Sequence, residues 1–400
     1  MESARRTVTL RDRLSWPSTL AKAYFEVVSG ANPDSKGSDG VTIEQFRNNA
    51  RSYLSQLQRD IKTDRYKHGL GRAVAIPKNP SLPAAKGNVR PITVFTIRDR
   101  IVQRAISNII WPHVRDRIHS EVSYGGIRKY ATAHGKHSTS SSVTKNVESA
   151  AMRILTLRAS GFSYVFETDI QSFYPSINKQ TLVTALSALL PDASLSDLVE
   201  AAIETAVINA DAIEARGLSE YWDPRLGVPQ GGVLSPMLAN LYLASFDDAM
   251  TADRFKMVRY VDDLVVLAKS EDEANRAHLR CRQLLSGLGL SIHGMNEPNN
   301  KGKIKTRIIS GFGPFEFLGI RFHKRTIVPA SDKLADLDDR MRELAHVRFG
   351  SRTLVELITR LNRLNQGWVS AYSFCDIPQS TIEQIDHKAR TRLAEWMLAN

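Results

Sequence analysis

The sequence predicts an α+β fold, because helical and strand patterns both occur along the chain and the strand segments come in closely spaced pairs. Two apolar runs, Phe255–Val261 and Leu264–Ala268, lie on either side of a pair of aspartates, which favours a β-hairpin. A second strand pair is predicted in residues 72–97. From about residue 331 onward, the apolar residues follow a helical period.

The N-terminal half is predicted to combine helices with the first strand pair. Residues 12–60 have a helical pattern, interrupted by a loop at Ser38–Phe46 that leads into a helix. After the strands, the helical period returns and places one apolar set on one side: Ile101, Val102, Ala105, Ile109 and Ile110. The polar residues 134–146 predict a loop.

In the C-terminal half, residues 163–177 predict a strand followed by a turn, and Asn178 can cap the next helix. Ser270 and Glu273 have the spacing of a capping box that opens another helix. Residues 315–323 predict a further strand pair. The last helices include one apolar stripe: Leu354, Leu357, Ile358, Leu361, Leu364 and Trp368.

The composition is ordinary for a globular protein of 400 residues, with 42% hydrophobic and 24% charged residues. No apolar run approaches the roughly 18 residues that a membrane helix needs, and the first ten residues lack the apolar core of a signal peptide. Two isolated cysteines, Cys281 and Cys375, indicate neither a disulfide framework nor a zinc site. We therefore expect a soluble, cytoplasmic protein with no membrane partner.

Positive charge is concentrated in one stretch of the chain. The formal net charge is +12, and residues 62–137 contain 15 Lys or Arg against four Asp or Glu, an excess of 11. Such a concentrated field favours a polyanionic partner, either a nucleic acid or a nucleotide phosphate. The alternative is a solvated basic face that serves solubility.

Three aspartates occupy positions that favour metal binding. Asp169 ends a predicted strand, and Asp262 and Asp263 lie at the predicted hairpin tip, so the three could meet at one sheet edge. Clustered carboxylates repel one another unless cations lie between them, and hard oxygen ligands select Mg²⁺ or Mn²⁺. Two such ions about 3.5–4 Å apart can activate a 3′-hydroxyl and stabilise a departing pyrophosphate, which is the chemistry of nucleotidyl transfer.

Two further Asp–Asp pairs need a different interpretation. Asp247–Asp248 and Asp338–Asp339 stand in amphipathic helical patterns, and we interpret both as solvated helix faces. Asp262–Asp263 differs because apolar residues flank it on both sides. A tight turn alone would also explain this pair, and the same turn is how two carboxylates can reach one metal.

Several segments resemble a known family. FETDIQSFYPSI, GVPQGGVLSPMLANLYL and RYVDDLVVL, in this order, are similar to the palm motifs of reverse transcriptases. RAVAIPK, GNVRPITVFTIRDRIVQRAI and SYGGIRKY resemble the finger blocks of group II intron-encoded enzymes, and LNRLNQGWVSAY resembles their thumb. The resemblance covers roughly residues 15–400.

This resemblance implies a right-hand polymerase with three parts. The fingers, with an N-terminal extension, would span residues 1–160. A palm with an antiparallel sheet would span residues 161–328 and carry a helical insertion at about 178–226. A helical thumb would span residues 329–400.

The resemblance also implies roles in catalysis. Asp169, Asp262 and Asp263 would hold two Mg²⁺ ions, for which Mn²⁺ could substitute, and the carbonyl of Ile170 would complete one site. Lys305 matches a general acid for the pyrophosphate. A lysine that only neutralises phosphate charge is an equal alternative for Lys305.

Further residues would bind nucleotide, template and primer. Lys78 and Arg90 match finger residues that grip the triphosphate, one as a compact charge and the other as a bidentate fork. Tyr174 matches a steric gate against the ribose 2′-hydroxyl, with core packing as the alternative. Gln230 and Gly231 match the loop beside the nascent base pair. Template and primer contacts are assigned to Phe317, Leu318 and Gly319, which match the primer grip, and to Arg100 and Arg128.

Two positions depart from the intron-encoded pattern. Alanine is usual where Val261 stands, so the tip reads YVDD, and Tyr174–Pro175 replaces a more frequent Phe-Asp. The second variant resembles stand-alone bacterial enzymes of the abortive-infection and defence-associated type. Neither a DNA-binding module nor an HNH endonuclease follows the thumb-like segment, so we expect no autonomous intron mobility.

We therefore expect an RNA-directed DNA polymerase that acts on dNTPs and an RNA template and yields a DNA product. A dedicated non-coding RNA would template or prime synthesis, and the biological role would be antiviral defence. The alternatives are a group II intron maturase, that is, an RNA-binding splicing cofactor, and template-independent nucleotide polymerisation. The sequence leaves open whether the chain forms a homo-oligomer.

Overall fold

The computed structural model describes residues 7–78, 83–118, 121–126, 146–298, 302–346 and 353–399. Among these residues, no helix combines the length and the apolar character needed to cross a membrane. The chain forms two compact units. The first contains Met1–Lys145, Glu167–Val265 and Ala277–Arg307, and the second contains Asn146–Phe166, Val266–Arg276 and Ile308–Asn400. The fingers, palm and thumb limits given above stay a prediction.

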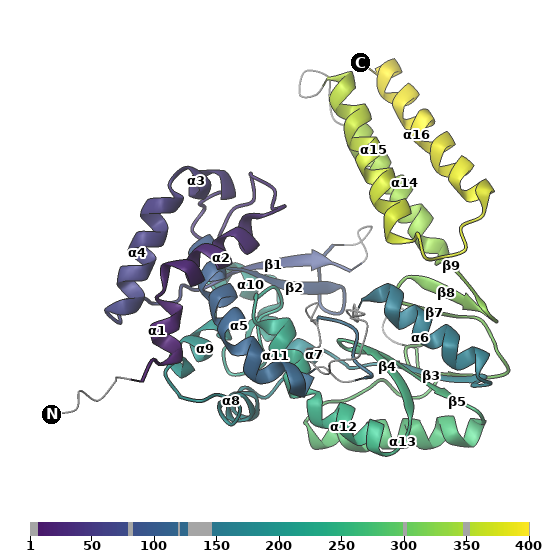
Figure 1. Cartoon of the computed structure of the whole chain (residues 1–400). Coiled ribbons are helices and arrows are strands. Elements are labelled where there is room, and N and C mark those ends of the chain that lie inside the picture. The colour runs from purple at the N-terminus through teal and green to yellow at the C-terminus, as the bar shows by residue number, and fades with distance from the viewer. Residues whose placement is uncertain are drawn as a thin grey trace, which may run out of the picture. The chain divides into compact units, whose positions relative to one another are not determined.

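The first unit begins with a group of helices (Figure 1). These are α1 (Leu10–Leu14), α2 (Pro17–Val28), α3 (Ile43–Asn48), α4 (Ala50–Lys62) and α5 (Ile97–Ile118), of which α1 and α2 pack against α5. Thr42 caps α3 in a capping box with Gln45, so the predicted loop into a helix is confirmed. The five apolar residues predicted to share one side of α5 are all buried, but so are Asp99, Gln103 and Ser107. Burial therefore extends around α5 rather than along one face.

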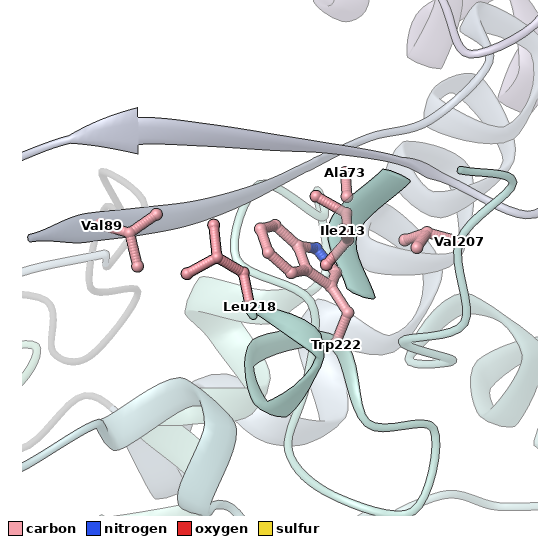
Figure 2. Close-up of a cluster of buried hydrophobic side chains, with 6 residues drawn as sticks. All are labelled: Ala73, Val89, Val207, Ile213, Leu218 and Trp222. Atoms are coloured by element: carbon pink, nitrogen blue, oxygen red, sulfur yellow. The ribbon is translucent and has the colours of Figure 1, made fainter. Parts of the chain in front are cut away.

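The predicted strand pair is an antiparallel hairpin of β1 (Arg72–Pro77) and β2 (Val89–Val94), supported by a distant segment. Figure 2 shows Trp222, Leu218 and Ile213 packed against it. Ile213 lies in α10 (Ala210–Glu214), Trp222 ends the 3₁₀ helix η1 (Ser219–Trp222), and Leu218 is the residue directly before η1. The indole of Trp222 donates to Thr93 Oγ1 at 3.1 Å. The segment predicted as an insertion thus holds the hairpin that carries Arg90.

A four-stranded sheet follows the order β4-β5-β3-β6. Its strands are β3 (Tyr164–Asp169), β4 (Lys256–Tyr260), β5 (Asp263–Ala268) and β6 (Arg307–Ile309). Only two residues join β4 to β5, which requires an antiparallel hairpin, so the predicted hairpin around the aspartate pair is confirmed. Helix α12 (Ala244–Ala252) packs along β4 (Figure 1).

The remaining helices of this region are α7 (Phe173–Ser176), α8 (Lys179–Ser187), α9 (Ser196–Ala202), α11 (Ser235–Tyr242) and α13 (Glu271–Gly287). Asn178 caps α8 as predicted, because its side chain accepts from the backbone of Thr181. The predicted capping box at α13 forms in one direction only. Ser270 Oγ accepts from the Glu273 amide at 3.2 Å, but the Glu273 carboxylate accepts from the amide of Lys269.

The second unit contains a small antiparallel sheet and a helical group (Figure 1). Its elements are α6 (Val147–Ala159), β7 (Phe315–Phe317), β8 (Ile320–His323), β9 (Thr326–Pro329), α14 (Ser331–Ala345), α15 (Leu354–Ala371) and α16 (Gln379–Ala399). The predicted strand pair and C-terminal helices are confirmed. The predicted apolar stripe on α15 is only partly right: Leu357 and Leu361 are buried, whereas Leu354 and Ile358 are each 38% exposed.

The two helical Asp–Asp pairs are not solvated faces, so that prediction is wrong for one residue of each pair. Asp247 is 1% exposed and pairs with Arg259, whose side chain is fully buried. Asp338 is 9% exposed and pairs with Lys388 and Arg392 of α16. An aspartate can occupy the inward face of an amphipathic helix when a cation from another element meets it there. The neighbours of these two aspartates, Asp248 and Asp339, are the exposed partners of surface arginines.

Candidate active site

The end of β3 and the tip of the β4–β5 hairpin are joined by a backbone hydrogen bond. The amide of Ile170 donates to the carbonyl of Asp262 at 3.1 Å. Asp169 is the last residue of β3, and Asp263 is the first residue of β5. All three aspartates are half-buried. The structure therefore brings Asp169, Ile170, Asp262 and Asp263 to one edge of the four-stranded sheet.

The carboxyl groups at this edge act on one another electrostatically. Burial, together with the charge of Asp169, raises the pKa of Asp262. Burial and the charge of Asp262 raise the pKa of Asp263 to about 7. Without a bound cation, burial and mutual repulsion thus disfavour the ionised forms of Asp262 and Asp263.

Lys305 is the cation that meets these carboxylates. Its Nζ lies 2.5 Å from Asp169 Oδ2. Burial alone would lower the pKa of Lys305, but Asp169, Asp263 and Asp262 together outweigh burial and the net shift is upward. The sequence prediction that Lys305 belongs with the aspartates therefore agrees with its position, whereas its chemical role is not shown by the contact.

A histidine that the sequence prediction missed lies on the other side of Asp169. His293 Nε2 is 3.5 Å from Asp169 Oδ1, and Gln171 Nε2 is 3.0 Å from His293 Nδ1. The pairing that brings His293 there is the bridge between Ile170 and Ile292. The sequence offered one signal for this position. It is the segment after α13 in which the polar His293 directly follows the apolar Ile292.

The donor set at this edge fits a hard divalent cation. Asp169 Oδ1 is buried and has no hydrogen-bond partner, and the neighbouring carboxyls have raised pKa values that a cation would lower. In the part of the chain that the structure describes, no three His, Cys, Asp or Glu side chains are arranged to hold a metal ion as they stand. Here the Lys305 ammonium engages Asp169, so a metal would have to replace it.

Tyr174 lies within electrostatic reach of the hairpin tip. Burial and the charge of Asp262 raise the pKa of Tyr174 to about 12. It belongs to the short helix α7, which closely follows β3 and packs against the glycine-rich loop at residues 227–236. A Cβ at Gly227 would lie 2.5 Å from the Tyr174 carbonyl oxygen, so only glycine fits there.

The glycine-rich loop is attached to the β1–β2 hairpin through Gln230 and Gly231. The carbonyl of Gln230 accepts from the amide of Thr93 at 2.7 Å. Gly231 has a φ of +111°, and a Cβ there would lie 2.7 Å from the Thr93 carbonyl oxygen. The loop is therefore fixed against the strand that carries Arg90.

The two predicted triphosphate residues are both exposed. Lys78 directly follows β1. Its positive charge lowers the pKa of Asp262, although burial raises that pKa by more, and this interaction indicates that Lys78 lies near the hairpin tip. Arg90, on β2, makes no ion pair with any residue that the structure describes. Both residues thus have exposed side chains and lie on, or directly after, a strand of the same hairpin.

The predicted template and primer residues belong to different parts of the chain, with Arg100 in the first unit and Phe317, Leu318 and Gly319 in the second. Arg100 is half-buried on α5, where burial and the charge of Arg104 lower its pKa. Phe317, Leu318 and Gly319 form the β7–β8 turn of the second unit, with Phe317 buried and a positive φ at Leu318 and Gly319, as a type I′ turn requires. Arg128, like most of the polar segment 134–146, lies outside the described residues.

Arg259 is a further residue that the sequence prediction missed. It lies in β4, directly before the YVDD tip, and is 0% exposed. Its guanidinium binds Asp247 with N–O distances of 2.8 and 2.5 Å. The available signal was a charged residue inside the apolar strand MVRYV, which must be paired if the strand is buried.

Several solved structures are similar to the chain at low identity. A partial Cas6-RT-Cas1–Cas2 complex has 24% identity, covers 70% of this chain and 41% of that chain, and has a TM-score of 0.38. Telomerase from Candida albicans, in complex with a fragment of telomeric RNA, has 12% identity, covers 89% and 64%, and has a TM-score of 0.42.

Curated relatives are similar over a little more than half of the chain. Protein YkfC of Escherichia coli is 27% identical over 58% of this chain and 55% of its own length. The putative COX1/OXI3 intron 2 protein of Saccharomyces cerevisiae is 25% identical over 57% and 23%. Group II intron-encoded protein LtrA of Lactococcus lactis is 23% identical over 61% and 35%. The chain thus spans from about a quarter to about half of these relatives' lengths.

Two family descriptions match consecutive parts of the chain. Residues 76–322 match "Reverse transcriptase (RNA-dependent DNA polymerase)", a range that includes the three aspartates, Lys305 and the glycine-rich loop. Residues 334–400 match "Group II intron, maturase-specific domain". With the observed helices and antiparallel sheets, these matches confirm the predicted α+β right-hand polymerase fold, and the chain belongs to the reverse transcriptase family as a group II intron-like member.

Proposed function

We propose that this chain is an RNA-directed DNA polymerase that transfers nucleotides at the edge formed by Asp169, Asp262 and Asp263. The observation that carries the proposal is the hydrogen bond from the Ile170 amide to the Asp262 carbonyl, which fixes the strand end against the hairpin tip. This junction lies inside the segment that matches the reverse transcriptase family. A cation bound between neighbouring carboxylates offsets their mutual repulsion and favours their ionised forms.

The three aspartates and the Ile170 carbonyl would hold two Mg²⁺ ions. When bound, these ions lower the pKa of the attacking 3′-hydroxyl and stabilise the charge on the leaving pyrophosphate. Lys305 would release Asp169 to the metal, and its ammonium would then be free to protonate the pyrophosphate. The contact of Lys305 Nζ with Asp169 Oδ2 at 2.5 Å supports a position for this ammonium beside the metal ligands.

The other residues near the tip would bind the incoming dNTP and the strands. Lys78 and Arg90 would hold the triphosphate, and their exposure on the β1–β2 hairpin supports this. Tyr174 would exclude the ribose 2′-hydroxyl, supported by its electrostatic contact with Asp262. Gln230 and Gly231 would lie against the nascent base pair. Arg100, Arg128 and the turn Phe317–Gly319 would contact template and primer.

Primer extension on a defined RNA heteropolymer tests the proposal. The wild-type chain should incorporate dNTPs in the presence of Mg²⁺, and sequencing should show a product complementary to the template. The double variant D262A/D263A should incorporate none, whereas D248N should match the wild type. Incorporation without complementarity would instead support template-independent synthesis, and equal incorporation by D262A/D263A would refute this active site.

A second candidate function is that of a group II intron maturase. The match of residues 334–400 to the maturase-specific domain favours it. A maturase would bind intron RNA and promote splicing whether or not it polymerises. A splicing assay with D262A/D263A separates the two functions, because retained splicing with lost incorporation assigns splicing to RNA binding alone.

We also propose a stand-alone role in antiviral defence in the cytoplasm, with a dedicated non-coding RNA as template or primer. Its support is the Tyr174–Pro175 variant of the palm motif. Sequencing the nucleic acid that copurifies with the chain tests it. One defined RNA with matching cDNA would support the proposal, and random cellular RNA without cDNA would contradict it.

A further inference from the structure

The hairpin tip has a strained backbone. Val261, the first residue of the two-residue connection between β4 and β5, has a φ of +60°. For a β-branched residue this left-handed conformation is an outlier, because the side chain crowds the backbone. Such a conformation persists only where surrounding contacts over-determine it. The tip that carries Asp262 and Asp263 therefore needs an external restraint.

Arg259 supplies a restraint from the strand side. Its Nη1 donates to the Val261 carbonyl at 2.9 Å and to Asn240 Oδ1 at 3.0 Å. Its backbone is fixed as well, since its amide donates to Val122 and its carbonyl accepts from Tyr124, each at 2.8 Å. Both the backbone and the guanidinium of Arg259 are thus hydrogen-bonded to other parts of the fold, and Arg259 contacts the strained peptide directly.

Asp247 and Asn240 hold the guanidinium in place. Asp247, on α12, accepts from Nε and Nη2, a bidentate pair that leaves Nη1 directed at the tip. Asn240, on α11, accepts a hydrogen bond from Nη1 through its Oδ1. Its Nδ2 donates to the Gly125 carbonyl at 2.9 Å. A lysine could reach Asp247 or Val261, but one ammonium lacks the planar fork that serves both.

A close backbone contact restrains the tip from another direction. A Cβ at Gly125 would lie 2.7 Å from a ring carbon of Tyr260 and 2.9 Å from Val261 Cγ2. The backbone of Gly125 therefore packs directly against Tyr260 and Val261, and a larger residue would not fit there. Arg259 and Gly125 thus contact this turn directly, and Asn240 on α11 and Asp247 on α12 hold Arg259, although none of these residues is an expected metal ligand.

We propose that Arg259 is a positioning residue: by holding the Val261 carbonyl, it sets the conformation of the YVDD tip and so the arrangement of Asp262 and Asp263 toward divalent cations. This inference rests on the proposed function, because it assigns Arg259 a task at that metal site. The buried Asp247–Arg259 pair then serves the geometry of the site and is more than a structural link between α12 and β4.

Two variants separate positioning from folding. R259K keeps a cation for Asp247, and D247L/R259M replaces the pair with apolar side chains of similar volume, a replacement that buried ion pairs can tolerate. Both should give cooperative thermal melts. Both should need more Mg²⁺ for half-maximal activity and should lose about 10²-fold in kcat, the cost expected for a misplacement of about 1 Å, with little change in the KM for dNTP.

A second readout does not depend on polymerisation. Binding of Mn²⁺, followed by electron paramagnetic resonance, should weaken in R259K and in D247L/R259M, and the amides of residues 260–264 should exchange faster with deuterium. The control D248N alters the exposed neighbour of Asp247 and should leave all these measurements unchanged.

The outcomes distinguish this inference from the proposed function. If the wild type makes DNA while folded R259K and D247L/R259M keep its Mg²⁺ requirement, kcat and Mn²⁺ affinity, then Arg259 has no positioning role. If the wild type makes no DNA, the proposed function fails, and the comparison of Mn²⁺ affinity and amide exchange still decides the role of Arg259.

Discussion

The hairpin tip and helix α12 carry the same Asp–Asp dipeptide in two opposite electrostatic settings. On α12, Asp247 is neutralised by a guanidinium that is buried with it, and Asp248 faces solvent. At the tip, Asp262 and Asp263 are half-buried with raised pKa values and no ion pair of their own in the described part of the chain. A carboxylate that the fold neutralises internally stabilises the fold, whereas one that has no ion pair of its own is available to bind a cation.

Neutralising the tip should have the largest effect on activity. D262N and D263N each remove one charged metal ligand, so we expect incorporation to fall by at least about 10³-fold, which corresponds to about 4 kcal/mol of transition-state stabilisation. Primer extension under single-turnover conditions measures this loss. The same substitution at Asp248 should leave the rate unchanged, and a comparable loss in D248N would mean that the two settings are not functionally different.

Breaking the buried pair on α12 should have the largest effect on stability. D247N leaves the Arg259 charge buried without a counter-ion, and such losses typically cost about 3–5 kcal/mol of the free energy of unfolding. D248N, at an exposed site, should change it by no more than about 0.5 kcal/mol. Urea denaturation measures both. Equal stability of the two variants would contradict the assignment of Asp247 as the internally neutralised member.

Asp338 extends the comparison to the second unit and should respond to acid. Burial alone would raise its pKa, but hydrogen bonds from Lys388 and Arg392 outweigh burial and the net shift is downward. A carboxyl with a lowered folded-state pKa contributes stability above its unfolded pKa of about 3.9 and loses it as pH falls through the folded value. D338N should therefore be less stable than the wild type at neutral pH, with a difference that shrinks in acid.

The matched control for this experiment is D339N. Asp339 pairs with Arg342 one turn away, and its side chain is 65% exposed. Exposed pairs of this kind contribute about 0–1 kcal/mol, so D339N should follow the wild type at every pH. Thermal melts of the three proteins from neutral pH down to about pH 3 would show it. A constant difference between D338N and the wild type would refute the titration of Asp338.

The sequence predicted those features that depend on local pattern. Asn178 caps α8 because a side-chain oxygen at that position satisfies a free backbone amide, and this requires no knowledge of the rest of the fold. The YVDD hairpin was predictable for the same reason, since two apolar runs flank one turn. The convergence of Asp169 on the tip could be expected only as a consequence of sheet pairing, and the Ile170–Asp262 hydrogen bond fixes it.

Features that depend on partners from distant elements were not predictable from pattern. Asp247 and Asp338 have the helical spacing of solvated residues, and only Arg259 on β4 and the basic residues of α16 make them buried. Leu354 and Ile358 show the reverse case, in which apolar residues at helical spacing are exposed because the core of α14–α16 uses Leu357 and Leu361. Periodicity specifies which residues share a face but does not specify what that face meets.

The last effect that we expect separates the tip from α12 by pH alone. The pKa of Asp263 is raised to about 7, so between about pH 4 and pH 7 the folded protein binds a proton that the unfolded chain releases. With a chelator present to remove divalent cations, the free energy of unfolding should therefore fall as pH rises through this window, with a slope of up to about 1.4 kcal/mol per pH unit.

The D263N variant should flatten this slope, and the D248N variant should keep it. Added Mg²⁺ should restore stability near pH 7 in the wild type but not in D263N, because only an ionised Asp263 gains from the cation. Because the pKa of Asp262 is also raised, a small slope should remain in D263N. A slope in D263N as steep as that of the wild type would assign the titration to another group and remove this electrostatic argument for a cation at the tip.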